Sequence, residues 1–326
     1  MKPITFFIVT ILLTLTSCEK VINIDTTISE SELVLNAVPS AEKQFFVNFS
    51  YTHFFLDTSN YHPVPNMDMV ITVNGNEYRP SSTHRCNYFF DYTPQPDDSI
   101  AIRVVAGNRT VTASTYVPRF PQITAPNVRY DSSGTFNLLH IEFPITDHPN
   151  YKNYYRIYIT QHDSGAYYHP FLEYLDTIDT VRTTTFFCFD SALIAGAQSL
   201  SSGLGVSEFN VPIFSQLLTT DSLFDGTTHP TSLQIMLLRD TNEIQPFIHQ
   251  YELTIECVTP ERMQYLQAIE ANNGMMSLIT EPPAMYSNVS GALGIFAGTA
   301  KKKYPLITLA DGQVVTSPTK AKRAKK

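Results

Sequence analysis

The segment that decides the fold lies in the first third of the chain and reads IAIRVVAGNRTVTASTYV (residues 100–117). Apolar and polar residues alternate on both sides of Gly107 and Asn108, with the two-residue period of a β-strand. In the returning half, Thr110 and Thr112 share one side of the strand, and the more apolar residues take the other. The segment therefore predicts a β-hairpin in a sheet that has one face in water.

Other short strands surround this hairpin. The pair Asn74-Gly75 is a hairpin signal, because both residues tolerate the positive φ angles of a type I′ turn. Several strands at this spacing predict an immunoglobulin-like β-sandwich at residues 33–118. Three prolines follow within residues 118–126, and proline cannot donate a hydrogen bond to a sheet. We therefore place a domain boundary at this point.

The pattern of short strands resumes after the prolines and predicts a second β-rich domain at residues 119–300. One segment of this domain has helical signals: Thr259 suits an N-cap, Pro260 suits the first turn, and apolar residues then recur at helical spacing. We expect one short helix at residues 260–272 in a mainly β fold.

The composition agrees with a folded, strand-rich protein. Hydrophobic residues make up 43% of the 326 positions and charged residues only 16%, which excludes intrinsic disorder. Phe and Tyr are abundant, Trp is absent, and 21 prolines favour turns. The formal charge of −8 argues against nucleic acid as a partner, because a nucleic-acid binder needs an extended basic face.

The first residues resemble an export signal. Lys2 precedes an apolar run that is too short to span a membrane, and the run ends in Leu15-Thr16-Ser17-Cys18, the form of a bacterial lipobox. We predict a lipoprotein signal peptide at residues 1–17, lipidation of Cys18, and a polar tether at 18–32. The alternative is an ordinary signal peptide that is cleaved nearby, with Cys18 uninvolved.

The basic residues concentrate at the C-terminal end, so the rest of the chain is strongly acidic. We interpret residues 301–326 as a basic tail with two alternative roles: a solvated, frayed end, or a segment that docks on anionic head groups.

Three cysteines remain after Cys18. Either Cys188 and Cys257 form a disulfide, or Cys86, Cys188 and Cys257 are all buried thiols, which is the simpler interpretation.

No motif in the sequence indicates catalysis, a metal or a cofactor. The nine histidines lack metal-ligand spacing, and there is no nucleophile elbow, phosphate-binding loop or dinucleotide fingerprint. Asp221 and Asp225 lie before Gly226 but lack the spacing of a calcium-binding EF-hand loop, so we interpret them as a turn. We therefore expect a non-enzymatic protein without a cofactor or metal.

A tyrosine-rich strand offers one candidate interaction face. Strand alternation places Tyr154, Arg156 and Tyr158 on one side, and Tyr and Arg are favoured at protein interfaces. The structural alternative is that these side chains are ordinary half-exposed residues of a β-sheet.

Features from both ends of the chain combine into a family resemblance. These are SCEKVINI (17–24), LVLN (33–36), the hairpin from Asp98 to Pro118, the helix at 260–269 and the closing SNVSGALGIFAG (287–298). Together they resemble the Bacteroidota outer-membrane lipoproteins of "domain of unknown function forty-two forty-nine". The resemblance implies an outer-membrane lipoprotein, β-rich in two parts, found with TonB-dependent receptors, and it carries over no catalytic residues. The glycines of the closing segment also indicate a last strand with close backbone approach or bulges.

The leading functional hypothesis is a lipid-anchored outer-membrane accessory protein that binds a TonB-dependent receptor or the nutrient which that receptor imports. The partners expected are membrane lipid, through Cys18, and such a receptor; periplasmic and surface-exposed orientations both stay open. The alternative is a surface module for glycan binding or adhesion. A third class, a hydrolase, predicts carboxylates of perturbed pKa in a cleft.

Overall fold

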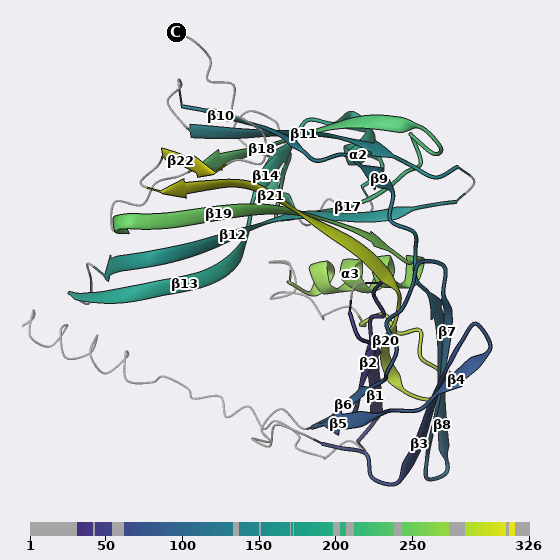
Figure 1. The fold of residues 1–326 in the computed structure, drawn as a ribbon. Coiled ribbons are helices and arrows are strands. Elements are labelled where there is room, and N and C mark those ends of the chain that lie inside the picture. Colours follow the sequence, from purple (N-terminus) through teal and green to yellow (C-terminus); the bar gives the residue numbers. More distant parts are fainter. Residues whose placement is uncertain are drawn as a thin grey trace, which may run out of the picture.

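The computed structural model describes residues 31–41, 43–53, 62–132, 137–149, 151–169, 171, 173–197, 203–206, 212–237, 243–273, 284–310 and 313–316. Over these residues the chain folds into two β-sandwich modules (Figure 1), which confirms the mainly β fold predicted from the sequence. The predicted signal peptide (1–17), Cys18 and nearly all of the tether lie outside the described residues.

The N-terminal module packs two sheets around one core. Along the described strands, the first sheet has the order β20-β1-β2-β6-β5 and the second the order β4-β3-β7-β8. Their bounds are β1 (Leu33–Ala37), β2 (Phe46–Tyr51), β3 (Met67–Val73), β4 (Asn76–Tyr78), β5 (Ser82–His84), β6 (Asn87–Phe89), β7 (Ser99–Ala106), β8 (Arg109–Tyr116) and β20 (Leu293–Phe296). Alternate residues of both sheets point inward and are buried in a shared core, as expected of a sandwich.

The turn and strand signals of this module are confirmed. Asn74 and Gly75 have φ angles of 48° and 88°, as a type I′ turn requires, and they join β3 to β4. In β8, Val111 is buried, whereas Thr110 and Thr112 are exposed. The hairpin of residues 100–117 therefore has the one wet face that its alternation predicts.

The closing segment of the chain returns to this first module. β20 pairs in parallel with β1, with Val34 opposite Leu293, and Phe296 is buried in the N-terminal core. The boundary that assigned all of residues 119–300 to the second domain is therefore wrong for this segment. A parallel pairing between the two ends of the chain leaves no local trace in the sequence.

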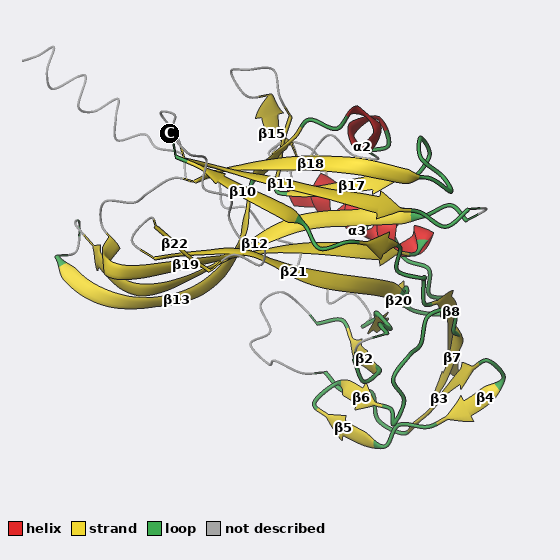
Figure 2. Cartoon of the chain, turned by 45° about the horizontal axis from the view of Figure 1, so that its top comes forward, coloured by secondary structure: helices red, strands yellow, loops and turns green. Residues whose placement is uncertain are grey.

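The second module is a larger sandwich. Its described strands form one sheet with the order β10-β11-β18-β14-β16-β15, with β9 beside β11, and another with the order β13-β12-β19-β21-β22, with β17 beside β12. The bounds are β9 (Gln122–Ile123), β10 (Asn127–Asp131), β11 (Asn137–Thr146), β12 (Tyr154–His169), β13 (Tyr174–Thr184), β14 (Phe186–Cys188), β15 (Gly203–Val206), β16 (Pro212–Phe214), β17 (Gln216–Thr220), β18 (Thr228–Leu237), β19 (Glu243–Val258), β21 (Thr299–Ala310) and β22 (Gln313–Thr316). A single core cluster joins the two sheets, which lie one above the other in Figure 2.

The start of the predicted basic tail is part of this core. β21 pairs along its length with β19, and Leu306, Ile307 and Leu309 are buried. The expectation of a frayed end from residue 301 is therefore wrong up to Ala310. Lys301, Lys302 and Lys303 suggested a solvated segment, but the apolar residues that follow them belong to the same strand.

Two helices complete the described part of the chain. α3 (Pro260–Asn273) confirms the predicted helix, and the Thr259 hydroxyl caps it by accepting from the N–H of Arg262 at 3.4 Å. α2 (Ser191–Ala195) was not predicted; the Asp190 carboxylate caps its N-terminus. Neither is long and apolar enough to cross a membrane.

The described cysteines are consistent with the simpler interpretation. Cys86, Cys188 and Cys257 are all free thiols and all buried. Cys188 and Cys257 belong to the core of the second module, where they pack as small apolar side chains do.

Candidate functional site

The tyrosine face predicted as a candidate interaction surface lies partly beneath α3. Tyr154 packs against Met263 and Leu266 of the helix and against the neighbouring strands. Because the helix occupies this part of the sheet, Tyr154 contributes to the packing of α3, as in the structural alternative.

Arg156, the central residue of that face, belongs to a polar network between the sheet and α3. Its guanidinium group lies 3.3 Å from the Glu256 carboxylate and donates to the side-chain oxygen of Gln216 at 2.7 Å. Gln216 in turn donates to Glu270 of α3 at 2.6 Å, and the guanidinium group lies 4.5 Å from the Tyr158 ring centroid. The network attaches α3 to the sheet.

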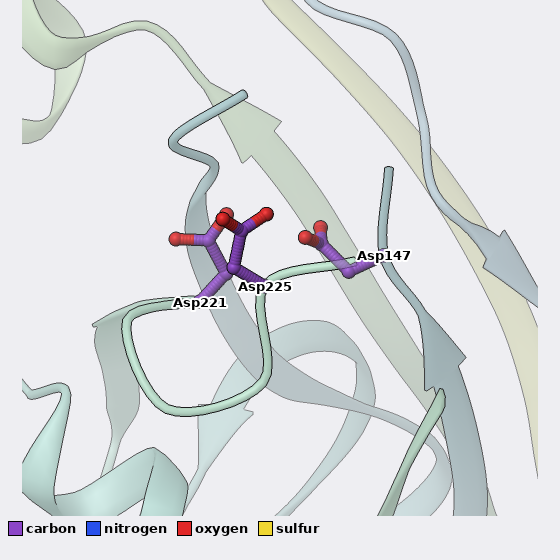
Figure 3. Close-up of side chains that lie close together, drawn as sticks. All are labelled: Asp147, Asp221 and Asp225. Atoms are coloured by element: carbon purple, nitrogen blue, oxygen red, sulfur yellow. The ribbon is translucent and has the colours of Figure 1, made fainter. Parts of the chain in front are cut away.

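Three carboxylates gather at one end of the second module (Figure 3). Asp147 follows β11, whereas Asp221 and Asp225 lie in the turn after β17, and one oxygen of each lies within 4.8 Å of the others. Asp147 and Asp221 are buried and Asp225 is exposed. The fold thus brings Asp147 next to the turn of Asp221 and Asp225, although Asp147 lies 74 positions before Asp221 in the sequence.

Donors from the protein stabilise these charges. Both oxygens of Asp147 accept hydrogen bonds, one from the Asn153 amide at 2.8 Å and from the Tyr155 hydroxyl, the other from the Gly226 N–H at 3.2 Å. Asp221 accepts from the backbone N–H of Asn153 at 2.6 Å. The carboxylates therefore tie the ends of three strands together.

Burial still raises the pKa of Asp221 to about 6, and the neighbouring charges of Asp147 and Asp225 add to the effect. The pKa of the Tyr155 hydroxyl is also raised, first by burial and then by acidic neighbours that include Asp147. Carboxylate oxygens of this kind are ligands that Ca²⁺ accepts. The three carboxylates do not line an open cleft of the kind expected for a hydrolase. Asp221 is only 1% exposed, and donors from the protein occupy both oxygens of Asp147.

Strongly exposed apolar side chains of the described residues lie on the hairpin formed by the outer half of β12 and by β13, which we call the flap. Phe171 at its tip is 97% exposed, and Leu175 and Val181 on β13 are 60% and 68% exposed. β13 pairs with β12 and with no other described strand, so its second edge is open. In Figures 1 and 2 the flap extends away from the N-terminal module.

A polar groove of about 570 Å³ runs between the N-terminal module and α3. The outer face of β3, β7 and β8 contributes Thr72, Arg103 and Ser114, and the other wall has Glu261 and Tyr286. Residues that carry hydroxyl, guanidinium and carboxylate groups thus line it.

The fold and these surfaces define a protein of two β-sandwiches with an open-edged flap. The chain belongs to the family described as Domain of unknown function (DUF4249), which it matches over residues 19–304. The match confirms the domain of unknown function named from the sequence, and it extends beyond Gly298 into β21. No curated protein matches the chain in sequence.

Proposed function

We propose that the chain is a non-enzymatic, lipid-anchored accessory protein of the outer membrane that binds a TonB-dependent receptor through its flap. The observation that carries the proposal is the open edge of β13 with its exposed apolar side chains. The lipobox at Cys18 supports the location.

The edge of β13 has the properties of a docking strand. It is 11 residues long and free of proline, and an open edge presents unpaired backbone groups that can add a strand from another chain. Natural proteins usually protect such edges with charged side chains, bulges, prolines or cover. β13 carries Asp176, Asp179 and Arg182, which disfavour indiscriminate pairing, but its exposed Tyr174, Leu175 and Val181 favour a partner that covers them.

A pull-down from solubilised outer membranes tests the proposal. The wild-type chain is expected to recover a TonB-dependent receptor, and the Leu175→Lys/Val181→Lys variant is expected to lose it. Val315→Lys is the matched control, since Val315 is 59% exposed on β22, at the other end of the sheet. Recovery of the chain without a receptor, or equal recovery by the flap variant, would count against the proposal.

The lipid anchor at Cys18 is tested separately from receptor binding. Mass spectrometry of the mature protein is expected to find an acylated N-terminal Cys18, followed by Glu19. An unmodified mature N-terminus, or one at another residue, would remove the membrane attachment from the proposal.

The polar groove favours a second function, the binding of a surface glycan. Arg103, Glu261 and the hydroxyl groups of Thr72 and Ser114 can exchange hydrogen bonds with sugar hydroxyls, and Tyr286 offers an aromatic face. Affinity electrophoresis across a set of polysaccharides tests it. Retardation that Arg103→Ala abolishes would support glycan binding, and unretarded migration in every gel would exclude it for that set.

A further inference from the structure

A second groove lies at the junction of the two modules. It has a volume of about 450 Å³, and the segments that line it are far apart in sequence. Arg119 and Phe120 come from the connection after β8, and Lys301 and Lys302 from the start of β21. The volume is sufficient for a small organic ligand.

Three cationic side chains line this groove, those of Arg119, Lys301 and Lys302. The Lys302 ammonium group lies 4.9 Å from the centroid of the Phe120 ring, and the Arg119 guanidinium lies 2.5 Å from an oxygen of Asp97. The next lysine differs, because Lys303 is neutralised by Glu252 at 2.7 Å. The groove thus holds an excess of positive charge in a chain whose formal charge is −8.

The backbone adds a donor at the same place. The N–H of Thr299 donates to the carbonyl oxygen of Pro39, on the side of β21 away from β19. Because N–H groups point to alternate sides along a strand, the N–H of Lys301 faces the same side as that of Thr299. Lys301 and Ala41 both line the groove.

The rest of the wall is mainly apolar. Ala41, Pro96, Phe120 and Ala300 line the groove, together with His148. A fully hydrated ion gains no binding free energy from apolar side chains. A ligand that carries an apolar substituent does gain it, because the substituent is removed from water.

We propose that the junction groove binds an anionic amphiphile, a phosphate or carboxylate with an apolar substituent, between Arg119, Lys302 and the N–H of Lys301. The cations and the N–H hold the anionic group through charge-assisted hydrogen bonds, and Phe120 contacts the apolar part. Asp97 competes with the ligand for Arg119. This inference goes beyond receptor binding, since the groove does not include the flap.

Calorimetry with the full chain in maltoside detergent tests the proposal, with hexyl phosphate as the probe. Hexyl phosphate is expected to bind at least tenfold more tightly than inorganic phosphate. Arg119→Gln and Lys302→Gln are each expected to weaken it at least fivefold, and Asp97→Asn to strengthen it. Asn tolerates the φ of 71° at this position, so the Asp97 variant keeps its fold. Lys303→Gln, with its charge outside the groove, is the matched control.

A gain of affinity in Asp97→Asn cannot come from unfolding, so this variant keeps the test decisive if the others are unstable. No heat of binding with hexyl phosphate, or affinities that none of the three variants changes, would overturn the proposal. Equal affinity for inorganic phosphate would also overturn it, since the apolar wall would then have no role.

Competition with nanodiscs identifies the source of the anion. Displacement of hexyl phosphate by phosphatidylglycerol nanodiscs, but not by phosphatidylcholine nanodiscs, assigns the groove to a lipid head group. Persistence of binding in the presence of both assigns it to a soluble anion. The Leu175→Lys/Val181→Lys variant of the flap is expected to bind hexyl phosphate as the wild type does. The two proposals, anion binding in the groove and receptor binding by the flap, can therefore fail independently.

Discussion

Gly298 lies against the backbone of Tyr116 so closely that a Cβ atom at position 298 would stand 1.8 Å from the Tyr116 carbonyl oxygen. The N–H of Gly298 donates to the Thr115 hydroxyl at 2.9 Å, and its carbonyl oxygen accepts from the N–H of Thr259 at 3.2 Å. Thr115 belongs to the N-terminal module, and Thr259 caps the helix of the second. One residue without a side chain therefore joins the two modules.

Gly298→Ala is expected to destabilise the protein by about 3 kcal/mol or more, because backbone atoms must move to admit the methyl group. Gly107→Ala is the comparison: Gly107 has a φ of 61° but open space around it, so only about 1 kcal/mol of backbone strain is expected. Urea unfolding of both variants measures the difference. Equal losses would mean that the contact with Tyr116 is not as close as described.

Removal of Arg156 is expected to cost about 3–5 kcal/mol, because it leaves the Glu256 carboxylate buried without its cation. Thr299 also donates to Glu256 at 2.8 Å, and the Arg262 guanidinium interacts with this carboxylate, but neither replaces the direct ion pair with Arg156. The double variant Arg156→Met/Glu256→Gln should lose less than the two single variants combined. Additive losses in the unfolding free energy would show that the two side chains are not coupled.

Local features of this fold could be predicted from sequence, because each depends on a few adjacent residues. The positive φ angles of Asn74 and Gly75 and the cap formed by Thr259 follow from backbone sterics and hydrogen bonding within a single turn. The close approach at Gly298 was also indicated by the glycines of the closing segment.

The features that sequence reasoning missed depend on contacts between distant residues. The pairing of Val34 with Leu293 joins opposite ends of the chain. The gathering of Asp147 with Asp221 depends on how β11 packs against β17, which belong to two different sheets. Asp221 and Asp225 could be recognised in the sequence as acidic residues of a turn, but no local pattern indicates that Asp147 joins them.

Asp221→Asn is expected to raise the melting temperature by several degrees at pH 8 and to change it little at pH 4. Because the folded-state pKa of Asp221 is raised to about 6, native Asp221 holds its proton more tightly than the unfolded chain does. Ionisation therefore costs stability as the pH rises from about 4 through about 6, and the amide avoids this cost. Asp225→Asn is the control, since Asp225 is exposed and solvent screens its charge. A difference that does not depend on pH would contradict the raised pKa.

Leu306→Ala and Lys303→Ala distinguish a core strand from a frayed tail, because they lie three residues apart on β21 in opposite environments. Leu306 is fully buried in the core of the second module, so its truncation is expected to cost about 2–5 kcal/mol. The Lys303 side chain is 55% exposed and pairs with a carboxylate at the surface, so its loss is expected to cost at most about 1 kcal/mol. Guanidinium unfolding curves of the two variants provide the measurement. If Leu306→Ala unfolds at the same denaturant concentration as the wild type, β21 does not form part of the core, and the groove at its start loses the strand that positions Lys301 and Lys302.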